Sequence, residues 1–264
     1  MLQKRIIPCL LLRDGLLVKT IQFNNPRHIG EPIYAIKIFN DYEVDELMIV
    51  DIMASRCNNG NAQKNKIPFD LISKISDESC MPVTFGGGIR SIEDLKKLFN
   101  AGVEKACINT FAVENPSFIY DAASEFGSQS IMVALDVKQY SDGTYEVFTH
   151  GGTAPMHVDP VTCAIRMERQ GAGEILLNSI DKDGSMTGYD IPLIKAVTSA
   201  VNVPVIALGG AGKMEDFSKA LHEGNASAVA AGSMFLFFGR KRAVLINYPS
   251  REEIEGIISS ISLP

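Results

Sequence analysis

The chain has 264 residues, a formal net charge of −6 and 46% hydrophobic residues, enough to build a full core. The acidic balance argues against a nucleic-acid-binding protein, which needs a basic face. No apolar run reaches transmembrane length, and the N-terminus lacks the apolar core of a signal peptide. We therefore expect a cytoplasmic protein with neither a nucleic-acid nor a membrane partner.

Cysteine and histidine usage predicts neither a disulfide framework nor a metal centre. The four histidines form no metal-ligand pair. The cysteines are scattered without C-x-x-C spacing, and we expect reduced thiols at Cys9, Cys57, Cys80, Cys107 and Cys163. No motif in the chain indicates a cofactor.

Short apolar runs of strand length alternate with amphipathic segments of helix length. The strand candidates cover residues 5–11, 46–51, 82–86, 104–109, 130–136, 174–179, 203–208 and 226–231. Their near-continuous Ile, Val, Leu and Ala content is typical of parallel strands that are buried on both faces. Between them, Ser91 and Asp190 have the character of N-caps for two predicted helices.

Two long segments, 12–31 and 137–158, follow the first and fifth predicted strands. Each contains an Asp-Gly pair, Asp14-Gly15 in one and Asp142-Gly143 in the other, flanked by residues of alternating polarity. This pattern predicts a β-hairpin after each of the two strands.

The two halves of the chain resemble each other. The run Pro82–Gly88 returns as Pro204–Gly210, 122 positions later (204 − 82), and Glu46 returns as Glu174 ahead of another apolar strand. A half-length repeat of β/α units predicts a single-domain (β/α)8 TIM barrel over residues 1–264, built from two similar half-barrels. A doubly wound open sheet is the alternative, but it does not predict the repeat.

In such a barrel the carboxyl ends of the strands meet at one mouth, where function concentrates. Glycine-rich or small-residue turns follow four of the predicted strands: Gly86-Gly87-Gly88, Asn109-Thr110, Gly209-Gly210 and Gly232-Ser233. Open backbone N–H groups and helix N-termini suit phosphate oxygens, although glycine also serves ordinary tight turns. We expect two opposed phosphate sites, and hence a ligand with a phosphate at each end.

Carboxylates stand at three strand ends. Asp51 ends the second strand, Asp183-Gly184 follows the sixth, and each could hold a ligand or a neighbouring loop. Asp136 ends the fifth strand, whereas Leu11 stands at the corresponding place in the first. A buried carboxylate without a role is costly, so Asp136 is a candidate catalytic residue.

A second charged set lies at the opposite ends of the strands: Arg5, Glu46, Lys105 and Glu174. These four residues could form a solvated rim or, with side chains turned inward, a closed salt-bridged ring across the barrel floor. The sequence leaves both possibilities open.

Several motifs of the chain resemble the cyclase subunit of imidazole glycerol phosphate synthase, the HisF family, over nearly its whole length. They are Lys4–Leu10, Asp45–Leu47, Phe85–Ile89, Ile108–Thr110, Val113–Ser117 and Ser179–Gly184. The resemblance implies a barrel that pairs with a glutaminase at its N-terminal face. Ammonia released from glutamine would pass up the barrel and react at the mouth with a ribulosyl-phosphate nucleotide.

The same resemblance assigns roles by position. It makes Arg5, Glu46, Lys105 and Glu174 the gate of the ammonia tunnel, and Asp136 one of two catalytic aspartates. Leu11 stands where the family has the second aspartate, and Asn178 where it has threonine. Losing a positioned acid or base typically lowers a rate by about 10²–10⁴. Asp14, in the loop that follows, is not expected to replace it.

The segment Cys9–Val18 resembles more closely a divergent branch of the family, the acetamidino-modification proteins of surface-polysaccharide (O-antigen, lipopolysaccharide) biosynthesis. That branch implies delivery of ammonia to a third protein, which amidinates an N-acetylated sugar. A genuine cyclase of histidine biosynthesis and a non-catalytic scaffold that binds a phosphorylated ligand are the alternatives. For the basic stretch Gly239–Arg242 we expect a solvated helix face, with a partner or ligand contact as the alternative.

Overall fold

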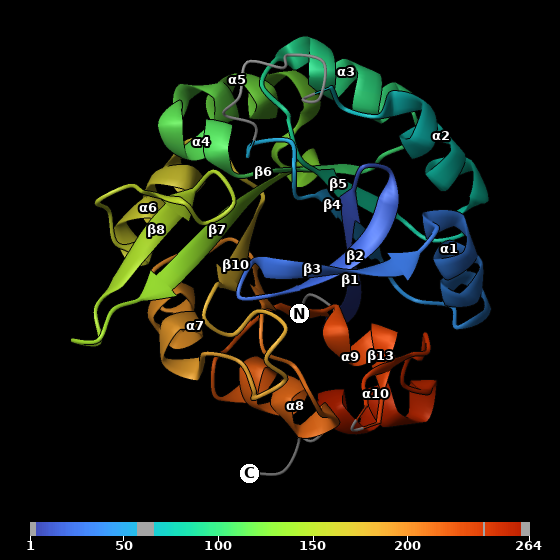
Figure 1. Ribbon diagram of the computed structural model, residues 1–264. Coiled ribbons are helices and arrows are strands. Elements are labelled where there is room, and N and C mark those ends of the chain that lie inside the picture. The colour runs from blue at the N-terminus through green and yellow to red at the C-terminus, as the bar shows by residue number, and fades with distance from the viewer. Residues whose placement is uncertain (1–3, 57–65, 240, 260–264) are drawn as a thin grey trace.

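A computed structural model describes residues 4–56, 66–239 and 241–259. Its centre is a closed barrel of eight parallel strands (Figure 1). In order around the barrel these are β1 (Arg5–Arg13), β4 (Leu47–Asp51), β5 (Val83–Gly86), β6 (Lys105–Ile108), β7 (Ile131–Gln139), β10 (Glu174–Ser179), β11 (Val205–Leu208) and β12 (Ala228–Ala231). Because β12 pairs with β1 and β7 pairs with β10, no edge is left open. The predicted (β/α)8 barrel is confirmed, and the open sheet is wrong.

Helices surround the strands and bury their outward side chains. They are α1 (Pro32–Asp41), α2 (Phe69–Glu78), α3 (Ile92–Asn100), α4 (Thr110–Glu114), α5 (Ser117–Phe126), α6 (Pro160–Arg169), α7 (Ile191–Thr198), α8 (Met214–His222), α9 (Ser233–Leu236) and α10 (Arg251–Ser259), with a 3-10 turn at Ser128–Ser130. The two predicted N-caps are confirmed. Ser91 Oγ accepts a 3.1 Å hydrogen bond from the amide of Asp94, and Asp190 Oδ1 accepts one of 3.1 Å from Leu193.

The hydrophobic core has two parts because successive strand residues face opposite sides. On β1, Ile6 and Leu10 belong to the large cluster between strands and helices, while Ile7 and Cys9 belong to a second, inner cluster. The inner cluster consists of strand residues alone and fills the barrel: Ile7, Cys9, Met48, Cys107, Met132, Ala134, Leu176, Ile206, Ala228 and Ala230. The core therefore fixes which strand side chains point into the barrel.

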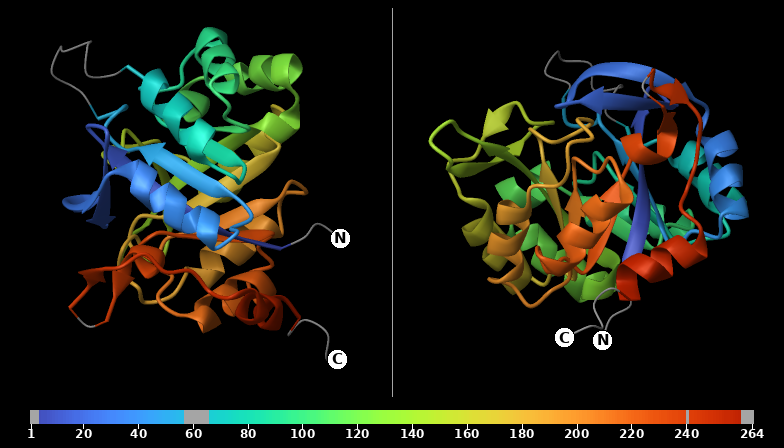
Figure 2. Two further views of the ribbon diagram at one scale, coloured as in Figure 1. Left: turned by 90° about the vertical axis from the view of Figure 1, so that its right-hand side faces the viewer. Right: turned by 90° about the horizontal axis from the view of Figure 1, so that it is seen from below.

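The half-barrel repeat continues beyond the strands. β1 and β7 are both nine residues long and both run into the predicted hairpins, β2 (Leu16–Ile21) with β3 (Asn24–Gly30), and β8 (Tyr145–Thr149) with β9 (Ala154–Pro155). In the first turn Asp14 and Gly15 have φ of 52° and 80°, the left-handed pair that a two-residue hairpin requires. Figure 2 shows the β2–β3 hairpin on the mouth side and both chain termini on the opposite side.

The basic stretch Gly239–Arg242 is not on a helix, so that expectation is wrong. It joins β13 (Phe237–Phe238) to β14 (Ala243–Val244) as a turn, closed by a 3.0 Å bond from the Arg242 amide to the Gly239 carbonyl. Lys241 is exposed, and Arg240 lies outside the described residues. The stretch reverses the chain between two antiparallel strands, and a tight turn does this where a helix would carry the chain onward.

Two further findings concern the described ranges only. No helix in them is long and apolar enough to cross a membrane. Four cysteines are unpaired thiols, namely Cys9, Cys80, Cys107 and Cys163, whereas Cys57 lies outside the described residues.

Candidate functional site

The carboxyl ends of the barrel strands enclose a cavity of ≈ 130 Å³ at the mouth. Of the predicted site residues it is lined by Leu11, Asp51, Gly86, Gly87, Gly88, Asn109, Thr110, Asp136 and Asp183. The others at this face lie outside its wall: Gly184, Gly209, Gly210, Gly232 and Ser233. One glycine-rich turn and the carboxylates therefore share one cavity, and the second glycine-rich pair does not open into it.

Asp136 is held between two amides at the end of β7. Its carboxylate accepts hydrogen bonds from Asn109 Nδ2 at 3.0 Å and Asn178 Nδ2 at 2.9 Å. Burial raises the pKa of Asp136 from 3.8 to about 7, against the opposing effect of both amides and of the Arg56 charge. A carboxyl group that titrates near neutral pH can accept and return a proton at that pH.

The corresponding place in the first half of the barrel is apolar. Leu11 pairs in register with Val50 on β4, just as Asp136 pairs with Asn178 on β10. Asp14 cannot supply the missing carboxylate because its side chain is 74% exposed and lies 3.6 Å from that of Arg13. The mouth therefore has a polar wall at Asp136 and an apolar wall at Leu11.

The glycine-rich turn after β5 closes one side of the cavity. Gly87 and Gly88 have φ of 122° and 76°, and a Cβ on Gly87 would lie 2.7 Å from the carbonyl oxygen of Asp51. Only glycine fits there, and its backbone stays open toward the cavity. Asn109 and Thr110 stand beside it at the start of α4, with Thr110 Oγ1 accepting a 3.1 Å bond from the His150 amide. This wall can surround an anion.

The second glycine pair packs against the end of β10 and the loop that follows it. Gly209 and Gly210 have φ of 94° and 111°, and a Cβ on Gly209 would lie 2.7 Å from the Ser179 carbonyl oxygen. A Cβ on Gly232 would lie 2.5 Å from Lys19 Nζ on β2, so this lysine covers the turn after β12. Ser233 Oγ is buried and has no hydrogen-bond partner within the described ranges. A buried hydroxyl without a partner suits a bound oxygen.

Asp183 holds the first hairpin over the mouth. Its Oδ2 accepts hydrogen bonds from Thr20 Oγ1 at 2.6 Å and from the Phe23 amide at 3.1 Å. Its Oδ1 lies 3.9 Å from Lys19 Nζ. Asp51 likewise closes its own loop, since its Oδ1 accepts a 2.9 Å bond from the Met53 amide. Both carboxylates thus position loops, which was one of the two possibilities left open by the sequence.

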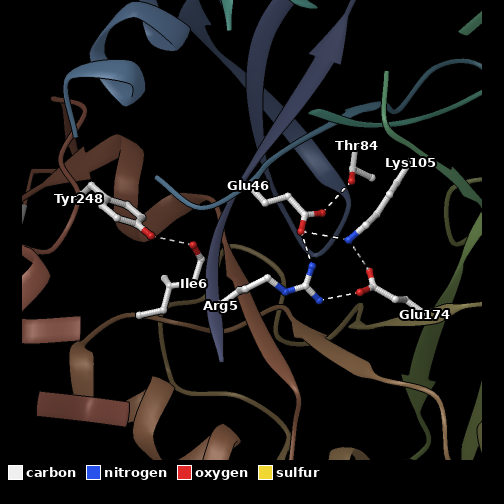
Figure 3. A network of polar contacts seen from close by, with 7 residues as sticks. All are labelled: Arg5, Ile6, Glu46, Thr84, Lys105, Glu174 and Tyr248. Carbon is white, nitrogen blue, oxygen red and sulfur yellow. Dashed lines mark hydrogen bonds and ion pairs between the residues drawn. The ribbon is translucent and has the colours of Figure 1, made fainter. Parts of the chain in front are cut away.

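At the floor of the barrel the four strand-start charges form a closed ring (Figure 3). Arg5 pairs with Glu46 and lies 2.6 Å from Glu174. Lys105 Nζ lies 3.3 Å from Glu46 and 3.1 Å from Glu174. Thr84 Oγ1 adds a 2.8 Å hydrogen bond to Glu46, whose side chain is only 4% exposed. The charges are turned inward, and the solvated-rim interpretation is wrong.

The comparisons with known proteins agree with this architecture. A family model described as "Histidine biosynthesis protein" matches residues 5–240. The chain is 46% identical over 255 residues to a Pseudomonas aeruginosa protein provisionally named imidazole glycerol phosphate synthase subunit hisF2, covering 97% of this chain and 99% of that protein. It is 44% identical over 235 residues to "Imidazole glycerol phosphate synthase subunit HisF" of Alkaliphilus metalliredigens, covering 89% and 91%. The chain belongs to the HisF family.

Two cations in the mouth of this HisF-family chain escaped the sequence analysis. Lys19 is 5% exposed on β2 and lines the cavity, as does Arg56 from the loop after β4. The alternation Leu17-Lys19-Ile21 could have shown that Lys19 shares a strand face with apolar residues. Nothing in the sequence around Arg56 indicates its position. Across the described ranges, no group of three or more His, Cys, Asp or Glu residues could hold a metal ion.

Proposed function

We propose that this chain is the ammonia-channelling, synthase-type subunit of a glutamine amidotransferase. In this proposal a glutaminase subunit docks at the N-terminal face of the barrel, beneath the ring of Arg5, Glu46, Lys105 and Glu174. The ring acts as the gate through which ammonia enters. The observation that carries the proposal is that the closed ring is present while Asp136 has no carboxylate counterpart at the equivalent position of the first half-barrel, where Leu11 stands.

The interior between ring and mouth favours neutral ammonia. The inner cluster is apolar, and the members that line the mouth cavity are Cys9, Cys107, Ala134 and Leu176. Ammonium would lose its hydration there without a counter-charge, whereas ammonia carries no charge to desolvate. In the ring each carboxylate has two cationic partners, so one contact can open while the other holds.

At the mouth, ring closure of a nucleotide intermediate would require an acid and a base on opposite sides. Leu11 and Val50 line the wall opposite Asp136 and have no group that can give or take a proton, so the expected loss of rate is about 10²–10⁴. We therefore propose that ammonia serves acetamidino-sugar formation by a third, sugar-amidating protein in surface-polysaccharide (O-antigen) biosynthesis. The glycine-rich turn after β5 would hold one phosphate of a ligand inside the mouth cavity, and the turns at Gly209-Gly210 and Gly232-Ser233 would hold the other beyond its wall.

A genuine imidazole glycerol phosphate synthase cyclase of histidine biosynthesis is the second candidate. One observation favours it: the pKa of Asp136 is about 7, so a single carboxyl could give and take the proton in turn. Two relatives are themselves named as synthase subunits without qualification, in Alkaliphilus metalliredigens and Caulobacter vibrioides.

The two candidates separate in a histidine auxotroph that lacks its own cyclase subunit, grown on minimal medium rich in ammonium. We expect no growth with the wild-type chain and growth with Leu11→Asp. Adding Asp136→Asn to the Leu11→Asp variant is the matched control and should abolish growth. Growth with the wild-type chain would support the second candidate instead. If neither the wild-type chain nor Leu11→Asp restores growth, although both are soluble in the cell, then Leu11 is not the reason that cyclase activity is absent.

A further inference from the structure

Arg56 carries a positive charge into the mouth cavity without an ionic partner. Its guanidinium lines the same cavity as Leu11 and Asp136. Nη2 donates hydrogen bonds to the Phe23 carbonyl at 2.9 Å and to the Gly151 carbonyl at 2.7 Å. Nε is buried, and among the described residues it has no hydrogen-bond partner and no carboxylate forms an ion pair with Arg56.

The carboxylates nearest to Arg56 are already engaged. Asp136 accepts from two asparagine amides, and Asp183 accepts from the first hairpin and lies beside Lys19. Burial lowers the pKa of Arg56. The negative charge of Asp136 raises this pKa by a smaller amount, although the two side chains form no ion pair. A half-buried cation bonded only to neutral carbonyls is costly unless an anion joins it.

The guanidinium is also held in place before any ligand arrives. Phe23 comes from the first hairpin and Gly151 from the turn after β8 in the second, so one nitrogen joins the two symmetry-related loops across the mouth. Gly151 has φ of 64°, and a Cβ there would overlap Arg56 Nε. Because the guanidinium is fixed before a ligand binds, the entropic cost of binding is lower.

We propose that Arg56 is a specificity-determining residue that binds a carboxylate of the phosphorylated ligand at the mouth. Nη2 uses both of its hydrogens on the two carbonyls, so Nη1, which makes no hydrogen bond to any of the described residues, is the nitrogen that can donate to an anion oxygen. The glycine-rich turn after β5 lines the same cavity and can hold a phosphate, which leaves Arg56 for a further acidic group beside the apolar wall at Leu11. The inference rests on the mouth being the ligand site of the proposed function, and it holds whether ammonia is delivered onward or consumed there.

Two sugar phosphates that differ only at C6 test the proposal: glucuronic acid 1-phosphate, with a carboxylate, and glucose 1-phosphate, with a hydroxymethyl group. Calorimetric titration of the full chain should show the carboxylate probe binding about tenfold or more tightly, as expected for a charge-assisted pair. Arg56→Gln should abolish this preference, weakening glucuronic acid 1-phosphate about tenfold or more beyond any effect on glucose 1-phosphate. Arg56→Lys should retain part of it.

Two further variants separate recognition from structure. Gly151→Ala keeps the charge but displaces the guanidinium, so it should also remove the preference. Lys97→Gln makes the same charge change on the exposed face of α3 and should preserve the preference. Thermal unfolding of each variant shows whether it is folded.

Equal affinity of the two probes for the wild-type chain would overturn the proposal, as would binding of neither at millimolar concentration. If Arg56→Gln lowered the affinity for both probes equally, the proposal would be contradicted and the role of Arg56 would be to hold the two loops together. Because these titrations measure binding alone, failure of the ammonia-delivery proposal would leave their outcome unchanged.

Discussion

Asn178 on β10 donates a 2.9 Å hydrogen bond to Asp136 on the neighbouring strand β7. The equivalent register pair of the first half-barrel is Leu11 and Val50, which have no polar side-chain atoms to exchange. The mouth of the duplicated barrel is thus polar on one side of its pseudo-symmetry axis and apolar on the opposite side. The proposal of ammonia delivery depends on this difference.

The carboxyl group of Asp136 should make stability depend on pH. In the unfolded chain it loses its proton near 3.8, and in the folded chain only near 7, so unfolding between these values releases a proton. The wild type should therefore lose stability as pH rises from about 4 to about 7, and no further above that. Relative to it, Asp136→Asn should gain on the order of 4 kcal/mol between pH 4 and pH 8, because about three pKa units at about 1.4 kcal/mol each no longer oppose ionisation. Urea unfolding at several pH values measures this, and a difference independent of pH would contradict the raised pKa.

Breaking the floor ring should destabilise the fold more than breaking a surface pair. Glu46→Gln leaves Arg5 and Lys105 to share Glu174, and we expect a loss of about 3 kcal/mol in the free energy of unfolding. The matched control is Glu93→Gln, which removes the pairing of a 66% exposed side chain with Lys97 and should cost less than about 0.5 kcal/mol. Chemical denaturation compares the two. Equal losses would mean that the ring contributes no more than an exposed ion pair.

Asp183 should control whether the first hairpin stays over the mouth. Asp183→Ala removes the acceptor of Thr20 and Phe23 and leaves Lys19 without its counter-charge, so the amides of β2 and β3 should exchange at least about tenfold faster. Hydrogen exchange followed by mass spectrometry measures this segment directly. Asp142→Ala, in the exposed turn between β7 and β8, is the control and should leave exchange in β2 and β3 unchanged. Unaltered exchange in the Asp183 variant would show that other contacts hold the hairpin.

The barrel could be predicted because buried parallel strands read as continuous apolar runs, and the predicted span 174–179 coincides with β10. The direction of the side chains at the strand starts could not be predicted, because a one-residue change of register turns a side chain to the opposite face of a strand. The ring formed by Arg5 and Glu46 therefore needed the structure. Contacts between distant loops were also beyond prediction. Asp183 meets Thr20 across 163 positions of sequence, and Arg56 reaches two hairpins from a loop without a motif.

The most direct test of the central claim is the ammonia-dependent cyclase rate. Purified wild-type chain and Leu11→Asp are assayed with ammonium salt and the ribulosyl-phosphate nucleotide intermediate, without a glutaminase. Ammonia delivery without ring closure predicts a wild-type rate about 10²–10⁴ below that of the Leu11→Asp variant. Wild-type turnover equal to or above that of the variant would contradict the claim and make the chain a working cyclase.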